Sequence, residues 1–282
     1  MRSAGVAIVA AVALAACGER ARPPAPIDVP ARAVTAGDPI WARLPAGAAL
    51  VLEVDLARLR SNAALGAVAR DVIDGGGLGE GAPTAALVDA ELVVLAAYAL
   101  GRPDAHTITI VRGGHRPDTA VALDDELWAL TDDGVTPTLV AVTPATSLAT
   151  DDGLRALRAA VMPEAATGAA LRLTARLDDD ARRGLAESFD TTAPPSAAAV
   201  WLDVADDVAA VVWLDGIAAT MAADWRARVA ALREIRLLGL APSIAATRLA
   251  ATSRGTTATV VIGPGRLARA VARWQAHRQL SP

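Results

Sequence analysis

Short apolar stretches alternate with segments of helical periodicity in the part of the chain that follows residue 37. The run Ala49–Leu56 is mostly apolar, with Glu53 and Asp55 at alternate positions, which is typical of a strand with two unlike faces. Ser61 is a suitable N-cap for a helix that reaches about Ile73 and ends at three glycines. A second helix, capped by Thr150 or Asp151, ends before Pro163. Four more strands are expected, at Glu91–Leu100, Thr107–Arg112, Glu126–Thr131 and Thr138–Thr143.

The second half of the chain repeats this alternation. Asp206-Asp207 joins two strands into an expected hairpin that carries Trp201 and Trp213 in its two arms. A long helix is expected from about Ile217 to Leu238, with a stripe of large apolar residues that we expect to be core. The expected strands are Ala170–Leu177, Ala198–Val204, Val208–Leu214, Ala245–Ala251 and Thr257–Ile262. The stripe consists of Ile217, Met221, Trp225, Val229 and Leu232.

Two pairs of similar segments suggest an internal duplication. The segment that begins at Gly168 matches the one that begins at Gly47 at six of ten positions, with an offset of 121 residues. The segment Thr138–Pro144 pairs with the run that ends at Pro264, and the two prolines are offset by 120. Because the two offsets differ by only one residue and the order is kept, we expect two units, 38–164 and 165–282. One irregular α+β domain is the alternative.

The expected strand–helix–strand–strand order points to a fold class. An order of β-α-β-β-α-β with antiparallel pairing resembles the ferredoxin-like plan. We therefore predict an α+β protein built from two tandem repeats of a ferredoxin-like strand–helix–strand–strand unit with antiparallel sheets.

The first 17 residues differ from the rest. Arg2 supplies a positive start, residues 4–16 are uncharged and largely apolar, and Cys17 follows. Thirteen residues in a helix extend about 20 Å, which is less than the roughly 30 Å of a bilayer core, so this segment fits a signal peptide rather than a spanning helix. An ordinary secretory signal with a chance cysteine is the alternative.

The residues Leu14-Ala15-Ala16-Cys17 resemble the lipobox of bacterial lipoproteins. The resemblance implies cleavage after residue 16, a diacylglyceryl group on the thiol of Cys17, acylation (palmitate among the expected fatty acids) of the new amino group, and a place in the cell envelope, which includes the periplasm. Gly18 stands where the family associates Asp with inner-membrane retention, which favours the outer membrane. The mature part resembles only uncharacterised bacterial lipoproteins with an opening like Val-Leu-Glu-Val-Asp-Leu-Ala-Arg-Leu-Arg, and no functional residue follows from that resemblance.

Residues 17–37 join the lipidated cysteine to the expected body. They contain four prolines, at Pro23, Pro24, Pro26 and Pro30, with Arg and Ala between them. A semi-extended segment of this kind reaches near 60 Å at about 3.1 Å per residue. We expect it to act as a tether that holds the body away from the membrane.

Composition and charge exclude several functions. All 27 basic residues are Arg, yet the net charge is −4, so the surface lacks the excess of positive charge that nucleic-acid binding needs. A single cysteine excludes an internal disulfide. The histidines His106, His115 and His277 have no second His or Cys at ligand spacing. We expect no metal, no cofactor and no catalytic constellation, because nucleophile motifs and phosphate loops also fail to appear.

Acidic residues gather in short clusters. Paired carboxylates can serve acid–base catalysis or bind calcium, but these sit at expected turns and helix starts, where Asp caps free N–H groups. No cluster has the spacing of a calcium loop. We expect caps rather than a site at Asp124-Asp125-Glu126, Asp132-Asp133, Asp151-Asp152, Asp178-Asp179-Asp180 and Asp206-Asp207.

The end of the chain is basic. Residues 235–282 contain seven Arg and no acidic residue, whereas residues 117–190 contain 14 acidic residues against six Arg. A C-terminal helix from about Arg266 to Leu280 would place Leu267, Val271 and Trp274 on one face. We expect this helix to dock on the acidic middle of the chain or of a second copy. A patch for anionic head groups or an acidic envelope protein, made of Arg266, Arg269, Arg273 and Arg278, is the alternative.

Two classes of function remain. The first, which we favour, is a membrane-anchored cell-envelope lipoprotein that acts as a non-enzymatic binding or scaffolding module. The second is an envelope enzyme whose site is assembled from scattered Asp, Arg and His residues. A pocket lined by convergent titratable groups would favour the enzyme.

Overall fold

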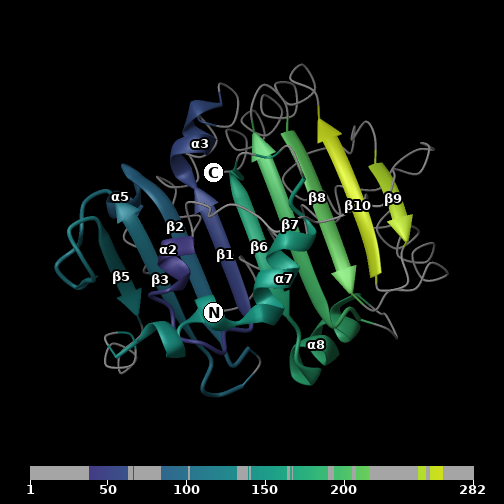
Figure 1. Cartoon of the computed structure of the whole chain (residues 1–282), viewed down its shortest axis with the longest axis horizontal. Coiled ribbons are helices and arrows are strands. Elements are labelled where there is room, and N and C mark those ends of the chain that lie inside the picture. Colours follow the sequence, from purple (N-terminus) through teal and green to yellow (C-terminus); the bar gives the residue numbers. More distant parts are fainter. Residues whose placement is uncertain are drawn as a thin grey trace, which may run out of the picture.

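A computed structural model describes residues 38–62, 66, 84–100, 102–131, 139, 141–163, 166, 168–189, 194–204, 208–215, 247–251 and 255–262. Ten antiparallel strands form one twisted sheet in the order β4-β5-β3-β2-β1-β6-β7-β8-β10-β9 (Figure 1). The first five strands are β1 (Leu50–Asp55), β2 (Ala90–Tyr98), β3 (His106–Gly113), β4 (Val121–Ala122) and β5 (Leu127–Thr131). The other five are β6 (Leu171–Arg176), β7 (Ala197–Val204), β8 (Val208–Asp215), β9 (Thr247–Ala251) and β10 (Gly255–Ile262). The α+β class with antiparallel pairing is therefore confirmed.

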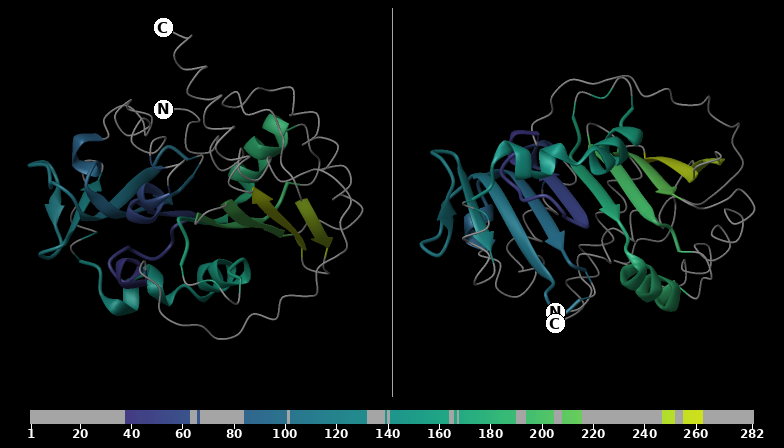
Figure 2. Two further views of the ribbon diagram at one scale, coloured as in Figure 1. Left: turned by 90° about the horizontal axis from the view of Figure 1, so that it is seen from above. Right: turned by 60° about the horizontal axis from the view of Figure 1, so that its bottom comes forward.

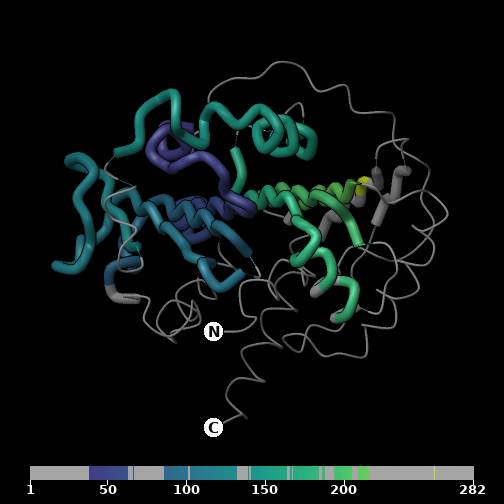
Figure 3. The backbone as a smooth tube through the Cα atoms, turned by 90° about the horizontal axis from the view of Figure 1, so that it is seen from below, coloured from purple at the N-terminus to yellow at the C-terminus, as the bar shows by residue number. Residues whose placement is uncertain are grey.

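Short helices lie on both sides of this sheet (Figures 2 and 3). One face, which we call face A, carries Val51, Glu53 and Trp201 and is covered by α2 and α7, whereas α5 and α8 lie on the opposite side, face B. The helices are α2 (Asp38–Trp41), α3 (Leu56–Ser61), α5 (Thr84–Leu87), α7 (Asp152–Ala160) and α8 (Asp179–Phe189), with 3-10 turns η1 (Pro144–Thr146) and η2 (Leu148–Thr150). Both faces are apolar, so the sheet is the middle layer of three.

Strands β1 and β6 join the two halves at the centre of the sheet. Their bounds differ by 121 residues, and Leu52 lies directly opposite Leu173, its counterpart at that offset. Outward from this pair, the first half has the order β1, β2, β3, β5, β4, and the second half has the matching order β6, β7, β8, β10, β9. The two halves therefore share one strand order about the central pair.

Four buried clusters of side chains form the core. On face A, Val51, Val94, Ile108 and Ile110 pack under Ile40 of α2, while Val161, Trp201 and Val211 form the cluster beside α7. On face B, a cluster with Leu56, Val111 and Trp128 lies under α3 and α5. A second cluster on face B draws its members from β1, β6, β7, β8 and Leu177.

The ferredoxin-like order is wrong for these units. A ferredoxin-like unit contains a split β-α-β crossover, in which the strands on either side of the first helix are parallel with another strand between them. Here β1 pairs directly with β2, and β6 with β7, in antiparallel registers. The single sheet across both halves also replaces the separate sheets that the repeat order predicted.

Two local predictions were also wrong. Leu139 is helical and buried, and Ala141 lies in a turn, so the strand expected at Thr138–Thr143 does not form in the residues described there. Ser61 ends helix α3 instead of starting it, because the side chain of Asp55 accepts the N–H of Arg58 and caps the helix six residues earlier. Helix α8 was not predicted. The long helix at 217–238 and the helix at 266–280 lie outside the described residues.

Candidate functional site

The residues with the most specific predicted roles lie outside the described part of the chain. These are the lipid-attachment residue Cys17 and the basic patch Arg266, Arg269, Arg273 and Arg278. The charged groups that the structure does describe at its centre are a second set, which the sequence did not single out.

A cluster of buried charges lies on face A at the centre of the sheet. Glu53 of β1 is only 5 % exposed, and its carboxylate accepts two hydrogen bonds from Arg158 of α7, at 2.6 Å from Nε and 2.8 Å from the second terminal nitrogen. Arg158 also donates to Asp38 of α2. Its guanidinium lies over the ring of Trp41, 4.9 Å from the ring centre. We call Asp38, Trp41, Glu53 and Arg158 the central cluster.

The electrostatics of the central cluster keep Arg158 charged and fixed in position. Burial alone would lower the pKa of Arg158, but the charges and hydrogen bonds of Glu53 and Asp38 outweigh burial and raise it. The guanidinium therefore stays protonated and cannot act as a base. A two-pronged Arg–carboxylate contact fixes geometry as well as charge, so the cluster joins α2, β1 and α7 into one unit.

A further arginine enters the same region from the neighbouring strand. Arg172 of β6 lies opposite Glu53 in the β1–β6 register and is 5 % exposed. Two arginines and two carboxylates thus gather at the centre of face A with no formal net charge. Such balance is what a buried set of charges requires.

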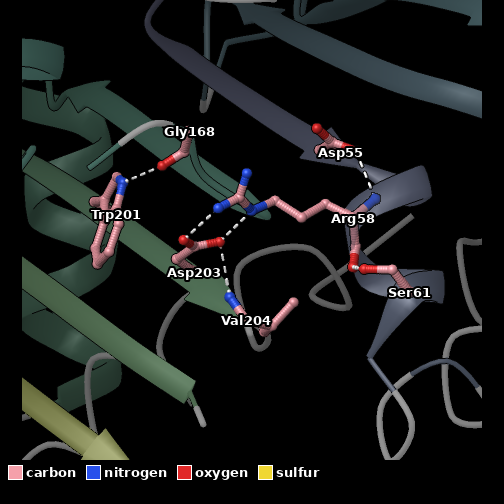
Figure 4. A network of polar contacts seen from close by, with 7 residues as sticks. All are labelled: Asp55, Arg58, Ser61, Gly168, Trp201, Asp203 and Val204. Carbon is pink, nitrogen blue, oxygen red and sulfur yellow. Dashed lines mark hydrogen bonds and ion pairs between the residues drawn. The ribbon is translucent and has the colours of Figure 1, made fainter. Parts of the chain in front are cut away.

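A second arginine cluster joins the two halves (Figure 4). Arg58 of α3 grips the carboxylate of Asp203 on β7 with Nε and with a terminal nitrogen at 2.7 Å from Oδ2. Oδ1 of Asp203 also accepts the N–H of Val204 at 2.8 Å. Nearby, the indole Nε1 of Trp201 donates to the carbonyl oxygen of Gly168 at 2.9 Å. We call Arg58 and Asp203 the lateral pair.

Three features of the lateral pair distinguish it from the central cluster. The side chains of Arg58 and Asp203 keep 30 % and 17 % exposure, so solvent reaches both. The hydrogen bonds that Arg58 donates to Asp203 raise the pKa of Arg58 and outweigh burial, which lowers it. A Cβ at Gly168 would lie 2.8 Å from a terminal nitrogen of Arg58, so glycine there lets the guanidinium approach the backbone.

The acidic clusters act as caps where the structure describes them. Asp151 accepts the N–H of Leu154 and caps α7, while Asp178 accepts the N–H of Ala181 and caps α8. Asp124 accepts the N–H groups of Glu126 and Leu127 in a turn. Several of these acids also meet an arginine within the acidic stretch, as Asp151 meets Arg176. Asp132-Asp133 and Asp206-Asp207 lie outside the described residues.

The two histidines in the described part of the chain occupy simple surroundings. His106 stacks on Tyr98, with ring centres 4.9 Å apart, and His115 is exposed. Burial raises the pKa of Tyr98, whose hydroxyl donates to the carbonyl oxygen of Pro45 at 2.9 Å. Among the described residues, no group of three or more His, Cys, Asp and Glu side chains could hold a metal ion.

Sequence reasoning missed both arginine clusters. One signal was available, since a carboxylate inside the apolar strand Leu50–Asp55 needs a partner if it is buried. The partner could not be chosen, because Arg158 is 105 residues away from Glu53, and Asp203 is 145 residues away from Arg58.

Among the described residues, no helix combines the length and the hydrophobicity needed to cross a bilayer. Neither the family models nor the curated proteins contain a match to this chain. One solved structure that it resembles is described as crystal form I of TP0453, with a TM-score of 0.45 and 10 % sequence identity. That similarity covers 83 % of this chain and 96 % of the other.

Proposed function

We propose that this chain is a lipoprotein of the bacterial cell envelope, anchored by acyl chains on Cys17 and exposed to the periplasm. The observation that carries the proposal is the segment Leu14-Ala15-Ala16-Cys17, placed directly after a charged start and a 13-residue apolar run. Two or three acyl chains hold a protein to a membrane far more firmly than one. Gly18 favours the outer membrane over the inner one.

The anchoring is tested by labelling cells with a clickable fatty acid. Wild-type protein should incorporate the label, and Cys17→Ser should lose it and accumulate as a longer precursor. Gly18→Asp is the matched control, because it should keep the label while moving the protein towards the inner-membrane fraction. Equal labelling of wild type and Cys17→Ser would contradict the anchoring.

The body of this lipoprotein acts as a non-enzymatic binding or scaffolding module. The support is that the buried pair Glu53–Arg158 and the partly exposed pair Arg58–Asp203 are both engaged in joining elements. An enzyme would need convergent titratable groups open to a substrate. Cells that express either the wild-type protein or Cys17→Ser can be treated with a cross-linker in vivo. Partners that are captured only by the anchored protein are then identified by mass spectrometry. Turnover of an envelope substrate by the purified protein would support the enzyme instead.

The basic C-terminal segment docks on the protein's own surface in this proposal. Its apolar residues Leu267, Val271 and Trp274 favour burial, and loss of a buried Trp costs about 3–5 kcal/mol. An exposed Arg pair contributes less than about 1 kcal/mol. Trp274→Ala should therefore lower the melting temperature of the full-length protein much more than Arg269→Ala. A Trp274→Ala variant that melts like wild type but loses affinity for anionic vesicles would identify Arg266, Arg269, Arg273 and Arg278 as a lipid-binding patch.

The fold arose by tandem duplication in this proposal, with one five-stranded unit in each half. The support is the shared strand order, the 121-residue offset of β1 and β6, and the pairing of Leu52 with Leu173. The Pro144–Pro264 match does not contribute, because Pro144 begins a 3-10 turn.

The strand registers turn the duplication into a test. Leu52, Leu95 and Thr109 lie opposite one another across β1, β2 and β3. The residues in the same positions across β6, β7 and β8 are Leu173, Val200 and Val212. In a crystal structure, superposition of the first half on the second should bring these three pairs of Cα atoms together. A superposition that aligns β1 with β6 but separates the other two pairs would leave a shared order without a repeat.

A further inference from the structure

A row of apolar side chains covers face B on strands β7 and β8. Val200, Ala210 and Val212 are buried there, while Leu202 and Leu214 are half-buried and pack against them. We call these five residues the β7–β8 apolar surface. Among the residues that the structure describes, the cluster to which they belong has members from β1, β6, β7 and β8 and from Leu177 after β6.

The chain leaves this surface from β8 and returns at β9. Both β8 and β9 pair antiparallel with β10, so they are parallel to each other with β10 between them. A connection between parallel strands must cross one face of the sheet. Residues 216–246 make this connection. The connection ends at Thr247, which pairs with Val260, and Val260 pairs with Ala210. The start of β9 is therefore level with Ala210 of β8.

Handedness determines which face is crossed. In Figure 1, α2 and α7 lie in front of the sheet, β8 runs downward, and β9 lies to its right and also runs downward. Crossovers between parallel strands are right-handed in about 98 % of cases. A right-handed path from β8 to β9 passes behind the sheet in this view, which is face B.

The first half contains a described connection of the same kind. Strands β3 and β4 are both antiparallel to β5, so they are also parallel with one strand between them. The connecting residues 114–120 end at Ala120, which packs against the face B cluster of Val111 and Trp128. The first half thus makes the crossing on face B, where handedness places the crossing of the second half.

We propose that the β7–β8 apolar surface is the docking site of the chain's own segment 216–246. Its sequence fits this surface, because Ile217, Met221, Trp225 and Val229 recur at helical spacing and would supply one apolar stripe. The occupant is a segment of this chain, not a lipid or a second copy, because covalent continuity from Asp215 to Thr247 requires the crossing.

Cysteine cross-linking tests the proposal on the full chain. Val211 and Val212 are a matched pair of buried valines, neighbours on β8 whose side chains pack in clusters on opposite faces. The Cys17→Ser chain has no other cysteine. In it, Val212→Cys and the control Val211→Cys would each be combined with Met221→Cys, Trp225→Cys or Val229→Cys, then oxidised or treated with a short bismaleimide.

We expect Val212→Cys to form an intramolecular link with at least one stripe position in most molecules, and Val211→Cys to form almost none. Links to Val211→Cys alone would place the segment on face A and overturn the proposal. A dimer linked through Val212→Cys alone would assign the surface to a second copy. No link from Val212→Cys to any of the three stripe positions, in protein whose circular dichroism matches wild type, would also overturn it.

Discussion

The central cluster and the lateral pair use the same chemistry at different depths. In each, an arginine from a helix grips a carboxylate on a strand with two nitrogens. The side chains of Arg158 and Glu53 are 12 % and 7 % exposed, whereas those of Arg58 and Asp203 are 30 % and 17 % exposed. Charge interactions strengthen as water is excluded, but so does the cost of leaving one partner alone. Burial, rather than the number of hydrogen bonds, should decide how much each arginine matters.

The largest effect should come from Arg158→Ala. This change leaves Glu53 buried without its main partner, and removing one member of a buried pair costs about 3–5 kcal/mol. Urea unfolding followed by circular dichroism would measure the loss. Arg158→Met combined with Glu53→Gln should recover part of it, because position 53 then carries no buried charge, while the partly exposed Asp38 still loses its contact with Arg158. If Arg158→Ala unfolded at the same urea concentration as the wild type, burial would not be what makes this arginine important.

Arg58→Ala should have a smaller effect. Asp203 keeps the N–H of Val204 as a partner and is open to water, so we expect a loss of about 1–3 kcal/mol. The same urea titration measures it, with Asp203→Asn as the reciprocal variant. If Arg58→Ala destabilised the protein more than Arg158→Ala, joining the two halves would matter more than burial.

At alkaline pH, Arg58 and Arg158 should stay charged, and stability should fall first through ionisation of Tyr98. Its pKa is raised by burial, so folding favours the neutral phenol. The stabilisation is fully present below the pKa of unfolded tyrosine, about 10, and falls as the pH rises above it. One pH unit above that value, the loss should be about 1 kcal/mol. Tyr98 is the only tyrosine, so tyrosinate absorbance follows it directly, and Tyr98→Phe should remove this part of the pH dependence.

The smallest effect should come from Arg155→Ala. Arg155 lies on α7 with Arg158, but its contact with Asp152 is 3.3 Å long and both side chains are mostly exposed. Pairs of this kind contribute about 0.3–0.5 kcal/mol. Unfolding of this variant is the matched control for Arg158→Ala, since both changes remove an arginine from one helix. A loss as large as that of Arg158→Ala would show that helix content, not the buried contact, is being measured.

Local patterns predicted the strands well and the contacts between them poorly. Nine of the ten strands were expected within a few residues, because alternating β-branched and apolar residues mark a pleated, buried surface. The exception, β4, has only two residues and no pattern to detect. Strand order and register depend on contacts far apart in sequence, such as Leu52 with Leu173, and propensity does not encode them.

Competing local signals explain the remaining errors. Thr138, Val140, Val142 and Thr143 have high β propensity, yet Leu139 is buried in the face A cluster within a helical turn, so tertiary packing overrides propensity there. Both Asp55 and Ser61 are good N-caps, and the pattern offered no reason to prefer the one at the end of the strand. Cap chemistry offered Thr150 or Asp151 before α7, and Asp151 is the cap.

The pairing of Leu52 with Leu173 has a consequence for how such a sheet can be assembled. Equivalent residues that face each other across antiparallel strands lie on a local two-fold axis. An edge of that kind is isologous: it is complementary to a second copy of itself. A single five-stranded unit with a free first strand could therefore close the same sheet as a homodimer. Fusing two units in one chain replaces that bimolecular step with a permanently high effective concentration of one half beside the other.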